Sequence, residues 1–228
     1  MSTALKSDPI VYPDSDGQPM ADNTKQFRWI VLIKENLEYL FLQDQDVFVA
    51  GDLFWYPVEG RPDIRIAPDV MVVFGRPKGD RGSYLQWQED NIPPQVVFEV
   101  LSPSNTIREM NRKLLFYNRY GVEEYYIYDP DTNELTGCDR QAEGLTTIES
   151  MDGWVSPRLG IRFALTPETL NIYDLQGNLF LTPVEMQARA EQEKARADYE
   201  AQKAQQEKAR ADRLANKLRE LGIDPEEV

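Results

Sequence analysis

The sequence contains no histidine and only one cysteine, Cys138. The absence of histidine excludes a histidine general base, Ser-His and Cys-His nucleophile pairs, and every zinc site that uses a histidine ligand. A single cysteine excludes a disulfide framework or a cysteine-clustered metal site within one chain, and it suits a reducing compartment. We therefore expect a cytoplasmic protein whose metal chemistry uses a divalent cation held by oxygen ligands.

Long apolar runs and an excess of positive charge are also missing. No run of 18 apolar residues occurs, and residues 1–20 lack the apolar stretch of a secretory signal, so we expect no membrane partner. The chain has 25 Lys and Arg against 39 Asp and Glu, a net charge of −14. From Val184 onward there are 11 acidic and 9 basic residues, which leaves 28 against 16, or −12, for the preceding part. This acidity argues against a broad nucleic-acid surface but is compatible with a local basic groove.

Composition divides the 228 residues into three parts. We expect a flexible N-terminal arm at 1–21, a folded domain at 22–181 and a charged helical tail at 182–228. The tail repeats E-K-A-R-A-D at 193–198 and 207–212, a period of two heptads whose core positions are mostly Ala and Glu. Two interpretations stay open: a solvated single helix with i,i+4 ion pairs, and a weak coiled coil that would form a homodimer.

Hydrophobic patterns within 22–181 predict an α/β domain with a mixed sheet. The expected elements are a helix from Asp22 or Asn23 to Phe41, strands at 47–56, 64–74 and 95–101, a helix at 104–120, and a strand at 125–128. The near-continuous apolar run at 95–101 suits a central strand covered on both faces. Shorter segments up to Gly177, separated by turn residues, predict extra strands.

Two carboxylates, Asp69 and Glu99, lie inside or beside these apolar strand patterns. A charge without a partner is costly to bury, and a cation would offset that cost. Two carboxylates with a nearby lysine are what metal-assisted phosphodiester hydrolysis uses. Structural alternatives remain: Asp69 could cap a turn, Glu99 could form an ion pair with Arg112 or Lys113, and Lys113 could be a solvated helix residue.

The order of four segments resembles the Uma-type family of restriction-endonuclease-like proteins, within the PD-(D/E)XK nuclease superfamily. The matching segments are P-D-V at 68–70, E-V-L-S-P-S at 99–104, Lys113 with Tyr117 four residues later, and G-V-E-E-Y-Y-I-Y-D-P at 121–130. The resemblance covers about residues 22–180. It implies a restriction-endonuclease-like core (helix, three strands, helix, strand) with extra C-terminal strands and a long charged C-terminal helix.

The resemblance also implies a site and a substrate. Asp69, Glu99 and the main-chain carbonyl of Val100 would bind Mg²⁺ or Mn²⁺, and DNA would be the substrate. The superfamily usually has a lysine two residues after the glutamate, where this chain has Leu101. In the Uma-type pattern the lysine comes from the following helix, so Asp69, Glu99 and Lys113 are the expected catalytic residues.

Three further residues are secondary candidates for the same site. Gln26 lies on the first helix, Asp52 follows the neighbouring strand, and Glu109 lies one turn before Lys113 on the same helix face. Asp52 also suits a turn or bulge.

The connection at 75–94 is long for a link between strands and suggests a lid or binding loop. Arg76, Lys78 and Arg81 are its candidate DNA-binding residues. The alternative is a short helix from Ser83 that covers the sheet, with Tyr84 and Trp87 as packing residues.

The sequence is compatible with three functions. The first is a Mg²⁺-dependent DNA endonuclease with a migrated catalytic lysine. The second is a non-catalytic binding or regulatory protein that keeps the nuclease fold and acts through its helical tail, which the acidity and Leu101 favour. The third is hydrolysis of a small phosphate compound. It is the least favoured, because the sequence contains no glycine-rich phosphate loop.

Overall fold

The structure is a computed structural model that describes residues 10–15 and 23–220. Its α-helices are α1 (Thr24–Leu40), α2 (Ile107–Tyr120) and α3 (Pro183–Glu220), with a short 3-10 turn, η1 (Gln86–Gln88). Its strands are β1 (Val47–Gly51), β2 (Trp55–Tyr56), β3 (Val70–Phe74), β4 (Tyr84–Leu85), β5 (Val96–Val100), β6 (Glu124–Asp129), β7 (Glu134–Gln141), β8 (Gly144–Thr147), β9 (Arg162–Leu165) and β10 (Leu170–Tyr173).

Six strands form a central mixed sheet in the order β1-β3-β5-β6-β7-β8. β5 and β6 are parallel, and the other neighbouring pairs are antiparallel. The parallel pair requires a crossover, and α2 supplies it between β5 and β6. All five residues of β5 are buried, as expected for a central strand covered on both faces. The chain is thus a mixed α/β protein with a central mixed sheet, as the sequence predicts.

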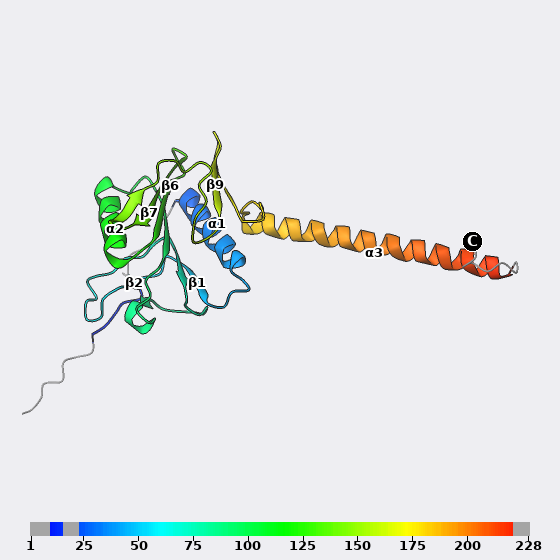
Figure 1. Cartoon of the computed structure of the whole chain (residues 1–228), viewed down its shortest axis with the longest axis horizontal. Coiled ribbons are helices and arrows are strands. Elements are labelled where there is room, and N and C mark those ends of the chain that lie inside the picture. The colour runs from blue at the N-terminus through cyan, green and yellow to red at the C-terminus, as the bar shows by residue number, and fades with distance from the viewer. Residues whose placement is uncertain (1–9, 16–22, 221–228) are drawn as a thin grey trace, which may run out of the picture. The chain divides into compact units, whose positions relative to one another are not determined.

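The two faces of the sheet bury separate apolar clusters. Ile33 and Leu37 of α1 pack on one face together with Phe163 of β9, and Tyr117 of α2 packs on the other with Trp55 of β2. Figure 1 shows α1 and α2 on either side of the sheet. Alternate residues of β3 and β5 contribute to opposite clusters, which is the two-residue period of a strand.

Local capping determines where the first two helices begin and end. The Asn23 side chain accepts a hydrogen bond from the Gln26 N–H at 2.8 Å, so Asn23 is the N-cap of α1. Thr106 caps α2 in the same way, two residues later than the predicted start at Ser104. Gly121 ends α2 with φ 93°, the left-handed conformation that glycine adopts without strain.

The predicted strand at 47–56 is two strands rather than one. Asp52 has φ 47°, and its N–H donates to the carbonyls of Pro68 and Asp69. This left-handed turn ends β1, and Trp55 then pairs with Ile66 in an isolated antiparallel bridge. The predicted pairing with 64–74 is confirmed, with Val47 opposite Phe74 at the far end.

Residues 10–15, within the predicted flexible arm, contact the folded domain. The Tyr56 hydroxyl donates to the Pro13 carbonyl at 2.6 Å, and the Tyr12 ring packs edge-on against Tyr56, with ring centroids 5.4 Å apart. These contacts fix the described part of the arm, because a buried tyrosine hydroxyl needs a hydrogen-bond partner. The rest of the predicted arm, 1–9 and 16–21, lies outside the described residues.

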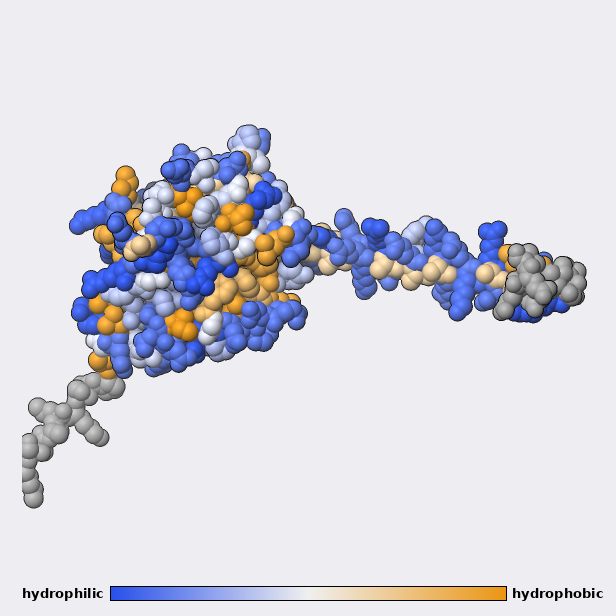
Figure 2. All heavy atoms as spheres, in the orientation of Figure 1, coloured by the Kyte–Doolittle hydropathy of each residue, from blue (hydrophilic) through white to orange (hydrophobic). Residues whose placement is uncertain are grey.

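Residues 183–220 form the single helix α3, and the chain divides into two compact units between Thr182 and Pro183. Arg189–Glu193 and Arg196–Glu200 are exposed i,i+4 ion pairs at 3.1 Å, as the single-helix interpretation expects. The surface of α3 visible in Figure 2 is mostly hydrophilic. Among the described residues, no helix is both long and apolar enough to cross a bilayer.

Candidate active site

Strand register brings Asp69 and Glu99 together. Val70 of β3 is opposite Phe98 of β5, so the next position along places Asp69 opposite Glu99. The neighbouring residues Met71 and Val97 belong to the cluster on the α2 face, and the two-residue period directs both carboxylates to that face. Two acidic residues 30 positions apart therefore lie side by side beneath α2.

Glu99 is almost completely buried, at 2% exposure. Lys113 Nζ of α2 lies 2.7 Å from Glu99 Oε2, and the Tyr117 hydroxyl donates to Glu99 Oε1 at 2.5 Å. Lys113 and Tyr117 are four residues apart, so one helix face presents both groups to the carboxylate. The sequence predicts the meeting of Glu99 and Lys113, which the structure shows as a direct ion pair.

The electrostatics of this pair reflect burial opposed by mutual attraction. Burial raises the pKa of the Glu99 carboxyl above its usual value, although Lys113, Tyr117 and Asp69 all act in the opposite direction. For Lys113, burial lowers the pKa of the ammonium, but the attraction of Glu99 and Asp69 outweighs it and leaves the pKa raised. We conclude that Lys113 is a cation at neutral pH, because its neutral form would leave two buried or half-buried carboxylates without compensation.

Asp69 is held by main-chain groups as well. Its Oδ2 accepts a hydrogen bond from the Val100 N–H at 2.6 Å. The N–H of Asp52 donates to the main-chain carbonyl of Asp69 at 3.2 Å. The Val100 N–H thus orients the Asp69 carboxylate across the ends of β3 and β5. The alternative that Asp69 only caps a turn does not account for its bond to the neighbouring strand.

Gln26 reaches the same place from the opposite face of the sheet. Its Nε2 donates to the Val100 carbonyl at 2.9 Å in a buried contact. A carbonyl oxygen has two lone pairs, so this bond orients the oxygen and leaves one acceptor site. The structure thus brings a secondary candidate into contact with a predicted ligand atom.

The other two secondary candidates, Asp52 and Glu109, lie near the charged residues of the site. Asp52 forms the turn that ends β1 beside Asp69. Glu109 is in the first turn of α2, accepts a hydrogen bond from Asn105 Nδ2 at 3.3 Å, and contributes to the raised pKa of Lys113. We therefore assign Asp52 a backbone role and Glu109 an electrostatic one.

Tyr117 is the residue of this site that sequence reasoning did not select. Its periodicity indicates only that it faces the sheet, because an apolar stripe contains many such positions. Its position four residues after Lys113 was the available signal. The hydroxyl is fully buried against Glu99, and burial raises the pKa of Tyr117 well above its usual value, so it stays a protonated donor.

Few side chains at this site could act as metal ligands. Among the described residues there is no group of three or more His, Cys, Asp and Glu side chains that could hold a metal ion. Asp69, Glu99 and the Val100 carbonyl offer two carboxylates and one main-chain oxygen. Such a set fits Mg²⁺ in type, because this cation prefers hard oxygen ligands and usually keeps several waters.

The predicted DNA-binding residues are occupied within the chain. Arg76 and Arg81 both form ion pairs with Glu89, at 2.9 and 2.7 Å, and their side chains are 15% and 13% exposed. Lys78 donates to the Val47 carbonyl at 3.2 Å and lies 3.5 Å from Glu38. These cations hold the connection 75–94 against β1, so the structure does not present them as free phosphate contacts.

That connection is neither an open loop nor the short helix expected from Ser83. It contains β4, which pairs in parallel with β2, followed by η1. Tyr84 is fully buried and its hydroxyl donates to the Ile92 carbonyl at 2.7 Å, so it packs as the structural alternative predicts.

Comparisons with known proteins place the chain in a family. The sequence matches the family Uma2, described as "Putative restriction endonuclease", over residues 17–168, and the chain belongs to this family. The resemblance inferred from the sequence is confirmed. The chain is also similar to a crystal structure described as "a putative nuclease belonging to DUF820" from Anabaena variabilis, with 15% identity and a TM-score of 0.42 over 60% of this chain and 74% of that one. No curated protein matches the chain.

Proposed function

We propose that this protein is a metal-dependent DNA endonuclease with a restriction-endonuclease-like core and a catalytic lysine supplied by α2. One observation carries the proposal: buried Glu99 lies beside Asp69 and directly contacts Lys113. Two carboxylates at the ends of adjacent strands, with one cation between them and the helix, are the groups that metal-assisted phosphodiester hydrolysis needs. Membership of the Uma2 family supports the same reaction.

Asp69, Glu99 and the Val100 carbonyl are the groups that would hold Mg²⁺ or Mn²⁺. When bound, the cation supplies a Lewis acid for the scissile phosphate and lowers the pKa of a water. The chain's own bonds prepare these oxygens. Tyr117 fixes the rotamer of Glu99, the Val100 N–H fixes Asp69, and Gln26 orients the Val100 carbonyl.

Lys113 has a distinct role in this proposal. Because its pKa is raised, it remains an ammonium at neutral pH and cannot act there as a general base. It can donate a hydrogen bond to the attacking water or offset negative charge on the phosphate in the transition state. Its position on α2 supplies the charge that Leu101 cannot.

Metal binding can be measured apart from catalysis. We expect isothermal titration of the wild type with Mn²⁺ to show a binding isotherm that Glu99→Gln loses, because the amide has no negative charge to offset. Asp90→Asn removes a carboxylate that is 78% exposed and serves as the matched control. Equal affinity of Glu99→Gln and wild type would contradict the assigned ligands.

Catalysis needs its own assay. We expect the wild type with Mg²⁺ to nick supercoiled plasmid DNA at low ionic strength, where weak binding to an acidic protein is least screened. Glu99→Gln should not nick above background. Absence of nicking by the wild type with both Mg²⁺ and Mn²⁺ would contradict the endonuclease proposal.

A non-catalytic protein acting through its helical tail is the second candidate. The favouring observation is that both oxygens of Glu99 already have partners within the chain, which satisfies the carboxylate without a metal. This candidate predicts neither Mn²⁺ binding nor nicking in the experiments above.

A further inference from the structure

The arginines of α2 form a solvent-facing stripe on an acidic protein. Arg108, Arg112 and Arg119 are all exposed. Their spacing of four and seven residues places them on one side of the helix, and Leu115, between them, is 69% exposed. We call Arg108, Arg112 and Arg119 the arginine stripe.

Several cations of the domain are neutralised by a neighbouring carboxylate, whereas the stripe is not. Arg76, Lys78, Arg81 and Arg158 each form an ion pair with an acidic side chain. Within the described part of the chain, no Asp or Glu forms a salt bridge with any member of the stripe. The Arg119 guanidinium lies over the Tyr120 ring, 5.6 Å from its centroid. The α2 helix has four basic residues and one acidic residue, a charge of +3, in a chain of net charge −14.

A groove lies between the stripe and the segment 63–66. Arg112 and Phe116 of α2 line a depression of about 470 Å³ whose other wall is the segment 63–66, including Arg65. This segment ends three residues before Asp69, and Arg112 is adjacent in sequence to Lys113. Arg65 lies over the Phe54 ring at 5.0 Å and donates to the Pro62 carbonyl. Arg65 and Arg112 thus line one groove, together with Asp63, which is paired with Arg61.

We infer that the arginine stripe binds the phosphate backbone of the DNA on which the proposed nuclease acts, and this inference rests on that proposed function. Arginine suits phosphate because its planar fork donates two parallel hydrogen bonds. Arg108 and Arg119 are 11 residues apart, or about 16 Å along the helix at about 1.5 Å per residue. DNA has one phosphate per about 3.4 Å of axis on each strand, so the stripe spans several successive phosphates.

The stripe positions DNA and does not catalyse the reaction. It lies on the side of α2 away from the sheet, whereas Lys113 and Tyr117 face Glu99. Phosphates bound by the stripe are therefore not the scissile phosphate. The arginines of the stripe supply the local positive surface that the bulk composition lacks, in place of the paired Arg76, Lys78 and Arg81.

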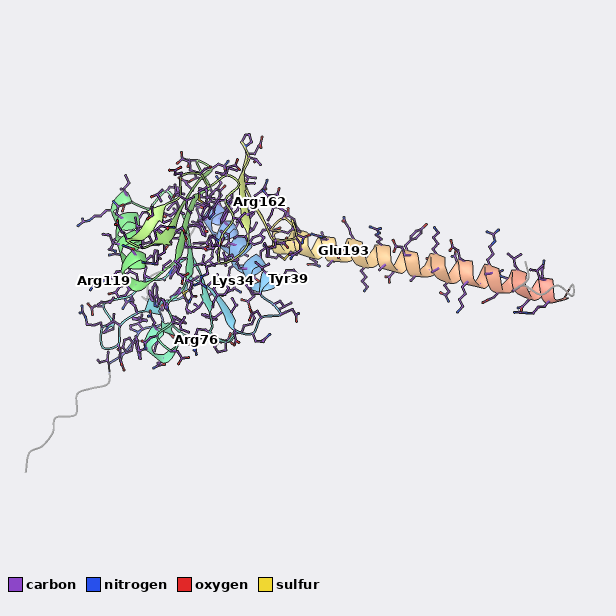
Figure 3. The ribbon with its side chains drawn as sticks, viewed as in Figure 1. Lys34, Tyr39, Arg76, Arg119, Arg162 and Glu193 are labelled. Atoms are coloured by element: carbon purple, nitrogen blue, oxygen red, sulfur yellow. The ribbon has the colours of Figure 1, made fainter. Side chains whose placement is uncertain are left out.

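The test uses the full-length protein and a fluorescent duplex of about 30 base pairs, in EDTA so that cleavage cannot occur. The stripe variant is Arg108→Gln/Arg112→Gln/Arg119→Gln, because glutamine keeps helix propensity. The control variant is Arg162→Gln/Arg189→Gln/Arg196→Gln, which removes the same charge from exposed arginines elsewhere. Figure 3 labels Arg119 and Arg162, which come from elements on opposite faces of the sheet.

We expect the stripe variant to bind the duplex roughly tenfold more weakly than the wild type at about 50 mM salt. The slope of log K against log salt should fall in magnitude by about 3, one for each lost phosphate contact, and the loss should not depend on DNA sequence. The control variant should stay within about twofold of the wild type. Circular dichroism verifies that both variants are folded.

Three results would overturn the inference: no binding of the duplex by the wild type, equal loss in both variants, or unchanged affinity of the stripe variant. A stripe variant that keeps its DNA affinity but loses self-association in sedimentation would assign the stripe to an acidic face of a second copy. Conversely, a wild type that binds DNA through the stripe but never nicks it would retain the inference and contradict the endonuclease proposal.

Discussion

At the scale of single residues, the pair formed by Glu99 and Lys113 determines the properties of the site. Breaking a buried ion pair from one side leaves an uncompensated charge, which typically costs about 3–5 kcal/mol. We therefore expect Lys113→Met to lower the free energy of unfolding by about that amount in EDTA. Urea denaturation at neutral pH measures it.

The double variant Glu99→Gln/Lys113→Met is the matched control for this prediction. It removes both charges, so most of the lost stability should return, because no unpaired buried charge remains. The Tyr117 hydroxyl can still donate to the amide oxygen at position 99. A double variant as unstable as Lys113→Met alone would show that packing, and not charge, explains the cost.

The sequence predicted the charged residues of the site but not the hydrogen bonds that hold them. Asp69 and Glu99 were recognisable because a carboxylate in an apolar strand needs a partner. The hydroxyl of Tyr117 was not, because a tyrosine on an apolar helix face looks like any packing residue until its hydrogen-bond partner is known. Gln26 reached Val100 across 74 positions, a contact that only the fold creates.

At the scale of elements, Glu89 is the carboxylate that pairs with both arginines of the connection 75–94, whereas the exposed Asp90 pairs with Arg76 alone. Glu89 accepts hydrogen bonds from Arg76 and Arg81, and its side chain is 15% exposed. Burial acts to raise the pKa of Glu89, but the two arginines outweigh it and the pKa is lowered. We expect Glu89→Gln to cost about 1.5–3 kcal/mol at neutral pH, as for hydrogen bonds to charged groups.

The pH dependence of that cost has a definite sign. A carboxyl whose pKa is lowered in the folded state stabilises the protein above the unfolded pKa, about 4.3 for glutamate, and this stability is lost as the pH falls through the folded pKa. The gap between wild type and Glu89→Gln should therefore close below about pH 4. Asp90→Asn, at an exposed residue, should cost less than about 1 kcal/mol at any pH. A gap that persists at low pH would contradict the electrostatic explanation.

Element order was predictable, whereas element ends and the role of the long connection were not. The apolar run at 95–101 and the stripe of α2 follow simple periods, so their types were correct. The break at Asp52 and the later start of α2 depend on single backbone hydrogen bonds. Arg76, Lys78 and Arg81 suggested phosphate contacts because sequence does not reveal that Glu89 and Glu38 lie beside them.

At the scale of the whole molecule, the division at Thr182 makes the tail testable. Asn36 forms two hydrogen bonds with the main chain of Leu181, which remain in a chain ending at Thr182. Since α3 is exposed and its ion pairs are internal to the helix, we expect this shortened chain to unfold cooperatively with a Tm within about 4 °C of the full-length value. Calorimetric scans at equal concentration compare them. A shortened chain without a cooperative transition would mean that the tail is required for folding.

The most direct test of the central claim is single-turnover nicking of supercoiled DNA by Lys113→Ala at low ionic strength with Mg²⁺. A cation lost from the transition state should reduce the rate by roughly two to three orders of magnitude. Mn²⁺ binding should persist, because Lys113 is not a ligand. Lys203→Ala, on the exposed tail helix, is the matched control and should nick like the wild type. A Lys113→Ala protein that nicks as fast as the wild type would contradict the assignment of Lys113 as the catalytic lysine.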